Sequence, residues 1–111
     1  MNFDEYQKKA IATAIYPTDK KLGGLIYCGL KLNGEAGEVA EKIGKVMRDD
    51  DFKLSREKRE AILYEMGDVL WYLANIAKEL NTSLDVVAVL NIDKLAKRKG
   101  KGTLKGSGDK R

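Results

Sequence analysis

Histidine is absent from this 111-residue chain, and cysteine, proline and tryptophan occur once each. The absence of histidine excludes histidine metal sites, histidine-dependent catalytic triads and an imidazole general base. Acid–base chemistry would therefore fall to carboxylates, lysines, tyrosines or metal-bound water. The single cysteine, Cys28, permits no internal disulfide, which is typical of proteins in a reducing cytoplasm.

Long apolar runs are missing as well. No run approaches the roughly 18 to 20 residues that a membrane span requires. The first residues, Met-Asn-Phe-Asp-Glu-Tyr, carry acids early and lack the apolar centre of a signal peptide. We therefore expect a cytoplasmic protein with no membrane partner, and the chain length predicts one domain at most.

The charge of the chain is unevenly distributed. Residues 94–111 hold eight Lys/Arg and one Asp, a net charge of +7, whereas the preceding residues hold thirteen Lys/Arg and sixteen Asp/Glu, a net charge of −3. The overall charge of +4 is thus a property of the C-terminal segment. Such a segment suggests contact with an anionic group, such as phosphate or an acidic protein surface.

Apolar residues recur at helical spacing in four segments, and no β-hairpin signal is present. We expect helices over about residues 2–16, 22–47, 56–80 and 84–99, with Pro17 ending the first and Ser55 and Asn81-Thr82-Ser83 capping the last two. The predicted fold is an all-α bundle of about four helices in residues 1–99, followed by a flexible, glycine-rich basic tail over residues 100–111. The second and third helices carry more apolar residues than one short chain covers, so we expect oligomerisation to complete the core.

Four carboxylates form two matched pairs, Glu35 with Glu38 and Glu65 with Asp68, each at a spacing of i, i+3. Residues three apart share one face of a helix. The second pair interrupts the most apolar segment of the chain, so we expect the acids to be buried, which is costly without cations. Two such helices facing each other would build an anionic cage that fits a hard divalent ion, above all magnesium.

Several residues near the acids have two interpretations. Lys42 and Lys45 follow the first pair and fit a solvated face as well as a functional role. For Trp71 and Tyr72 we favour packing in the core; the alternative is that their rings stack against a nucleobase. The amide of Asn75 would either read a nucleobase edge or form a bond across the bundle. The glycines of the second helix suggest close approach of another backbone or a ligand, and those of the tail suggest that its amides, together with Arg111, contact phosphate.

The acid pairs, Glu35-x-x-Glu38 and Glu65-x-x-Asp68 separated by 26 residues, resemble the ExxE…ExxD signature of MazG-like nucleotide pyrophosphohydrolases, in the all-α NTP pyrophosphatase superfamily. The resemblance covers roughly residues 22–111. It includes, besides the acids, the segments Gly34-Glu35-Ala36-Gly37-Glu38-Val39, Met66-Gly67-Asp68-Val69-Leu70-Trp71-Tyr72-Leu73, Asn91-Ile92-Asp93-Lys94-Leu95-x-x-Arg98 and Gly102-Thr103-Leu104-Lys105-Gly106-Ser107-Gly108-Asp109-Lys110-Arg111.

The resemblance implies hydrolysis of a nucleoside triphosphate to a nucleoside monophosphate and pyrophosphate. It implies that the four acids are catalytic and hold magnesium, with manganese as an alternative ion. The residues expected to bind substrate are Asn75, Asn91, Lys94, Arg98 and Arg111, and Glu41 is a candidate for orienting the attacking water. The family forms dimers or tetramers whose sites draw on more than one subunit, so a homodimer or homotetramer is expected.

Two other functions compete with this interpretation. The basic tail is compatible with a helical nucleic-acid-binding protein, but the acids would repel phosphates unless a metal covered them, which makes nucleic acid an unlikely partner. A structural oligomeric bundle, in which the acids pair with lysines across an interface, would need no chemistry at all.

Overall fold

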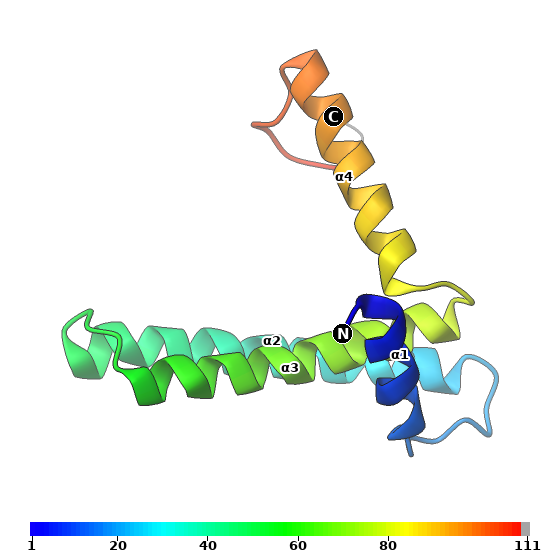
Figure 1. Cartoon of the computed structure of the whole chain (residues 1–111), viewed down its shortest axis with the longest axis horizontal. Helices are drawn as coiled ribbons and strands as arrows, with labels where there is room; N and C mark the ends of the chain where they lie inside the picture. The colour runs from blue at the N-terminus through cyan, green and yellow to red at the C-terminus, as the bar shows by residue number, and fades with distance from the viewer. Residues whose placement is uncertain (110–111) are drawn as a thin grey trace.

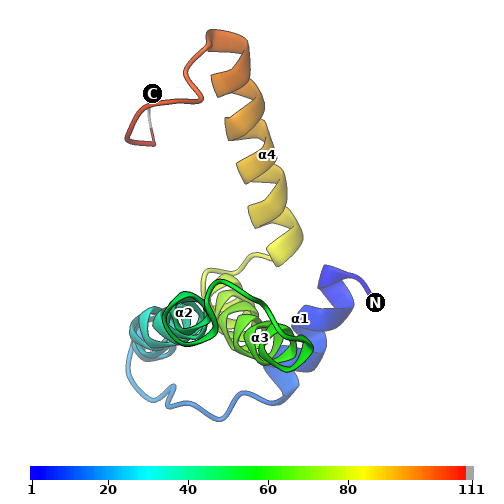
Figure 2. The same ribbon diagram turned by 90° about the vertical axis from the view of Figure 1, so that its left-hand side faces the viewer.

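The computed structural model describes residues 1–109 and is all-α over that range, with four helices in the order α1 (Phe3–Ala12), α2 (Gly23–Asp50), α3 (Arg56–Glu79) and α4 (Leu84–Lys101). The all-α prediction is therefore confirmed. Helices α2 and α3 lie side by side as a long antiparallel pair (Figure 1). The end-on view shows α3 between α2 and α1, while α4 points away from the pair (Figure 2).

The helix boundaries follow local chemistry. The hydroxyl of Ser55 accepts a hydrogen bond from the Lys58 amide, and that of Ser83 accepts one from the Val86 amide, so both predicted N-terminal caps are confirmed. The first helix was predicted to continue to Pro17, but it ends at Ala12. Its C-cap, Thr13, donates its hydroxyl to the Ala10 carbonyl at 2.7 Å and accepts the indole N–H of Trp71 at 2.8 Å.

Helix α2 continues three residues beyond the predicted end at Met47. The acidic run there does not break the helix, because Asp50 pairs with Lys58 of α3 and remains in the last turn. The chain reverses at Asp51 and Phe52, whose positive φ angles of 52° and 63° place both residues in the left-handed region. These two residues therefore form the turn that makes α2 and α3 antiparallel.

A small core joins α1, α3 and α4. Ala10, Ala74 and Leu84 are buried together, with Tyr6, Leu70 and Trp71 packed around them. The buried amide of Gln7 donates to the carbonyl of Thr82 at 3.1 Å and accepts the amide of Leu84 at 3.1 Å. Gln7 therefore fixes the loop from which α4 departs.

The single chain leaves much apolar surface exposed. The radius of gyration is 16.9 Å, whereas a compact chain of this length has about 13 Å. Among the described residues, no helix is both long and apolar enough to cross a membrane. The four helices form an open arrangement in the single chain, in which α4 contacts α1 and α3 but not α2.

The sequence suggested that another backbone or a ligand closely approaches the glycines of α2. A Cβ built at Gly29, Gly34, Gly37 or Gly44 meets nothing within 4 Å, so no other part of the described chain approaches them. The close approach occurs at Gly24, where a Cβ would lie 2.8 Å from the Tyr16 ring and would overlap the Glu79 carboxylate.

We predict that Gly24→Ala lowers the free energy of unfolding by about 1–3 kcal/mol, because the methyl group displaces the Tyr16 ring. In the control Gly29→Ala the added methyl enters open space, and helix propensity alone should raise stability by up to ~1 kcal/mol. Urea unfolding at one protein concentration measures both changes. Equal stabilities of the two variants would contradict the packing described at Gly24.

Candidate metal centre

Three of the four predicted acids converge in the α2–α3 seam. Glu35 and Glu38 lie on α2 and Glu65 lies on α3, and one carboxylate oxygen from each lies within 4.8 Å of the others. Asp68, one turn along α3, is outside this triad of oxygens but lines an adjoining cavity of about 300 Å³ with Glu35. The structure thus brings three of the four acids together, whereas the sequence predicted that all four would converge.

The predicted burial of these acids is wrong for the single chain. Glu38 and Asp68 are exposed, and Glu35 and Glu65 are only half-buried. The reason is that the apolar residues around Glu65 and Asp68 face several directions, and only part of that surface is covered by α2. The acids therefore line an open groove and keep access to water.

The acid triad is electrostatically strained. A hydrogen bond with Glu65 raises the pKa of Glu38, and the negative charges of Glu35 and Glu65 raise it further. A shared proton between two carboxylates relieves repulsion only in part. The ammonium of Lys42, 3.6 Å from Glu65, supplies a positive charge at the edge of the triad.

The residues present fit a hard divalent cation. The three converging ligand atoms are all carboxylate oxygens, which are the donors that magnesium prefers. Magnesium also keeps several bound waters, which suits a partly exposed site. Mutual repulsion of the carboxylates would be relieved by a divalent charge, so the strain itself favours occupancy.

Aromatic side chains adjoin the acids. The cavity beside Glu35 and Asp68 is also lined by Trp71 and Tyr72, whose rings meet edge to face with centroids 4.8 Å apart. Trp71 also packs against the core and donates to Thr13, so the favoured core interpretation holds for this residue. The exposed part of both rings still faces the groove next to the acids.

The residues predicted to bind phosphate on α4 lie away from the acids within one chain. Lys94 and Arg98 both contact the carboxylate of Asp109, at 3.4 Å and 3.6 Å, because the tail folds back along α4 (Figure 1). Arg98 is buried, and its guanidinium also donates to the Gly108 carbonyl at 3.3 Å. Asn91 is exposed on the same helix.

A further residue that was predicted to bind substrate, Asn75, does not lie at the groove. Asn75 is fully buried: its amide donates to the Trp71 carbonyl at 3.0 Å and accepts the Tyr16 hydroxyl at 3.3 Å. Of its two interpretations, the structure describes the bond across the helices. Arg111 lies outside the described residues.

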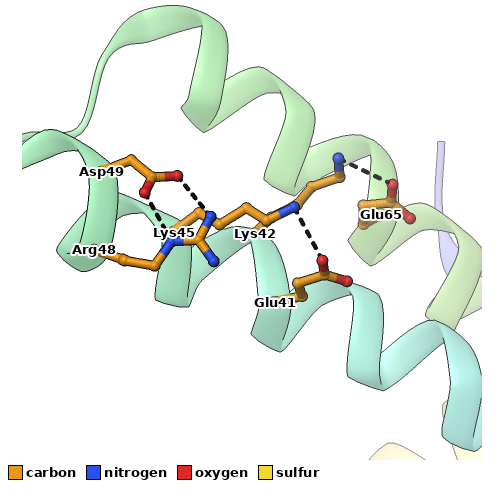
Figure 3. Close-up of polar contacts among 6 residues, drawn as sticks. All are labelled: Glu41, Lys42, Lys45, Arg48, Asp49 and Glu65. Carbon is orange, nitrogen blue, oxygen red and sulfur yellow. Dashed lines mark hydrogen bonds and ion pairs between the residues drawn. The ribbon is translucent and has the colours of Figure 1, made fainter.

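Lysines beside the acids form a group that the sequence analysis identified only in part. Lys42 extends from α2 to Glu65 on α3, while Lys45 turns back to Glu41 at 2.9 Å (Figure 3). This ion pair lowers the pKa of Glu41 and directs its carboxylate away from the triad. Lys58, which the sequence analysis did not single out, lies with Lys42 and Lys45 around a cavity of about 160 Å³. Lys58 lies seven residues before Glu65 and therefore on the same face of α3. This spacing would have predicted that Lys58 lies along the same seam as the acids.

Comparison with known proteins found a family and a relative that the chain resembles. The model of the MazG nucleotide pyrophosphohydrolase domain matches residues 28–103, a range that contains all four acids. The Gene 37 protein of Mycobacterium phage L5 is 43% identical over 114 residues, and the alignment covers 100% of both chains. No solved structure matches the chain.

We predict that Glu38→Gln raises the melting temperature in EDTA, because it removes a carboxylate from the strained triad. The pKa of Glu38 is raised above its ordinary 4.5 in the folded chain. Its ionisation therefore costs stability as the pH rises from 4.5 through the raised pKa. The advantage of the variant should be absent at pH 4.5 and present near pH 7, and magnesium should reduce it.

The control for this melting experiment is Glu60→Gln. Glu60 pairs with Arg56 at 3.2 Å on the exposed side of α3, so its removal relieves no repulsion. Its melting temperature should not exceed that of the wild type. Repulsion in the triad is contradicted if Glu38→Gln melts no higher than the wild type near pH 7.

Proposed function

The chain belongs to the MazG nucleotide pyrophosphohydrolase family, and from this premise we propose that it hydrolyses nucleoside triphosphates to a nucleoside monophosphate and pyrophosphate with magnesium. The observation that carries the proposal is the convergence of carboxylate oxygens from Glu35, Glu38 and Glu65 in a groove between the two helices. Asp68 completes the set of acids at the adjoining turn. Manganese would serve as an alternative ion, since it accepts the same oxygen ligands.

The side chains at the site would have different roles in this reaction. A magnesium ion bound by the acids would neutralise phosphate charge and lower the pKa of its bound water. Through the bound ion, the acids would position the phosphates of the substrate in the seam. Trp71 and Tyr72 line the neighbouring cavity, where the nucleoside would stack. With no histidine in the chain, the proton of the attacking water leaves through a carboxylate or the solvent.

The nucleic-acid alternative has less support. The tail carboxylate of Asp109 offsets the positive charges of Lys94 and Arg98 in the described chain. The alternative also leaves the carboxylate triad without a purpose. Binding of long DNA or RNA that exceeds the affinity for a nucleotide, without pyrophosphate release, would favour it.

Product analysis tests the proposed reaction. With magnesium, a panel of nucleoside triphosphates should yield monophosphate and pyrophosphate, and ¹⁸O from labelled water should appear in the monophosphate, because attack is at the α phosphorus. Glu38→Gln and Asp68→Asn should each lower kcat at least ~100-fold through lost stabilisation of charge. Orthophosphate as first product, or label in the pyrophosphate, would contradict the proposal.

We also propose that the protein is a homodimer or homotetramer. A groove of about 580 Å³ along α2 and α3 is lined almost entirely by apolar side chains: Ala36, Val39, Leu63, Met66, Val69, Leu70 and Leu73. On α4, Val89, Leu90 and Ile92 are each more than 60% exposed. Contiguous apolar surface of this kind is typical of a protein interface. A second subunit would also be able to bring Lys94 and Arg98 to the acids, which one chain does not.

Light scattering tests this assembly. At micromolar concentration the wild type should have at least twice the mass of one chain, and Leu63→Lys in the groove should weaken association, since it places a charge in the apolar surface. The control Ile15→Lys alters a side chain that is 97% exposed and outside the groove, so it should not change the mass. A wild type that remains monomeric would contradict the proposal.

A further inference from the structure

A largely polar stripe follows the α2–α3 seam. On α2 it contains Glu35, Glu38, Lys42 and Lys45, and on α3 it contains Lys58, Glu65, Asp68 and Tyr72, with the small apolar Ala61 between Lys58 and Glu65. Both series follow the spacing i, i+3, i+7, i+10, which keeps residues on one face of a helix. The two faces meet, since the acids of both helices converge and Lys42 contacts Glu65 across the seam.

The stripe has three successive zones. The cavity lined by Glu35, Asp68, Trp71 and Tyr72 lies at one end, and the carboxylate triad lies in the middle. The cavity lined by lysines lies at the other end, one helical turn beyond the acids: Lys42 follows Glu38 by four residues. One turn is about 5.4 Å, so the three zones follow one another along the seam.

The lysine cavity has the size and charge for a small anion. Its volume is about 160 Å³, room for about five waters at their liquid volume. Lys42, Lys45 and Lys58 line it from both helices, and their side chains are 39, 42 and 38% exposed. Such ammonium groups keep enough water to remain charged and enough freedom to turn toward a ligand.

Each of these lysines has an acidic partner in the described structure. Lys45 pairs with Glu41, Lys58 with Asp50 and Lys42 with Glu65. The third pair is special, because Glu65 belongs to the carboxylate triad. A divalent ion bound by Glu65 would replace Lys42 as the partner of that carboxylate. The Lys42 ammonium would then be available to an anion in the cavity.

We propose that this cavity, defined by Lys42, Lys45 and Lys58, binds the β and γ phosphates of the substrate and then the pyrophosphate product. This inference rests on the proposed function. It sets the direction of the substrate: the nucleoside lies toward Trp71 and Tyr72, and the terminal phosphates lie toward the turn between α2 and α3. It also makes phosphate binding at Lys42 dependent on prior metal binding at Glu65.

Calorimetric titration of inorganic pyrophosphate tests the cavity without any turnover. With magnesium present, Lys42→Gln and Lys58→Gln should each raise the Kd about tenfold, the loss of one charge-assisted contact. Lys42→Arg keeps the charge and should stay within about threefold of the wild type. The control Lys8→Gln removes an exposed lysine on α1 and should leave the Kd unchanged. Unchanged affinity in both cavity variants would overturn the proposal.

A second measurement needs no variant. Acetic anhydride modifies accessible lysines, and mass spectrometry of the wild type locates the modified positions. Magnesium pyrophosphate should protect Lys42, Lys45 and Lys58 from modification and leave the control residue Lys8 reactive. Protection of Lys94 alone would place the anion on α4 and overturn the assignment.

The two proposals fail in distinguishable ways. A wild type that binds magnesium pyrophosphate in the cavity, but releases none from any nucleoside triphosphate, contradicts the proposed reaction. A wild type that hydrolyses triphosphates, with pyrophosphate affinity indifferent to the cavity lysines, contradicts only the cavity.

Discussion

Repulsion between carboxylates at the α2–α3 seam is the interaction on which the rest of this structure depends. Two long helices hold Glu35, Glu38 and Glu65 close enough to raise the pKa of Glu38. Such closeness is unfavourable in an empty site, and helix pairing alone gives no reason for it. It would become favourable with a bound divalent cation, and the two helices would then hold the proposed ligands in place before the ion binds.

The lysines of the seam follow from the same constraint. Lys42 next to Glu65 moderates the negative charge without entering the triad, and Lys45 and Lys58 are held by Glu41 and Asp50. The seam therefore changes from acidic at the triad to rich in lysine toward the turn between α2 and α3. An acidic zone would suit a cation and a neighbouring lysine zone would suit an anion, which is why one stripe of two helices would serve for ion and substrate together.

The sequence predicted what depends on local spacing. The four helices, the Ser55 cap and the shared helix face of each acid pair all follow from i, i+3 and i, i+4 relations within single helices. The end of the first helix was missed because Trp71, 58 residues away, holds Thr13 at its C-cap. The exposure of Asp68 was missed, and Asn75 was left between two interpretations, because burial depends on which helix covers which face. The departure of α4 depends on the long-range contacts of Gln7, which no periodicity reveals.

Manganese binding measured by electron paramagnetic resonance tests the central claim, that the seam carboxylates form a divalent-metal site. Free Mn²⁺ gives a sharp signal that is lost on binding, so a titration counts sites without turnover or nucleotide. The account predicts at least one Mn²⁺ bound per wild-type chain, displaced by excess magnesium, and weakened at least ~10-fold in Glu65→Gln through the loss of one charged ligand. Equal Mn²⁺ binding by the wild type and Glu65→Gln would contradict it.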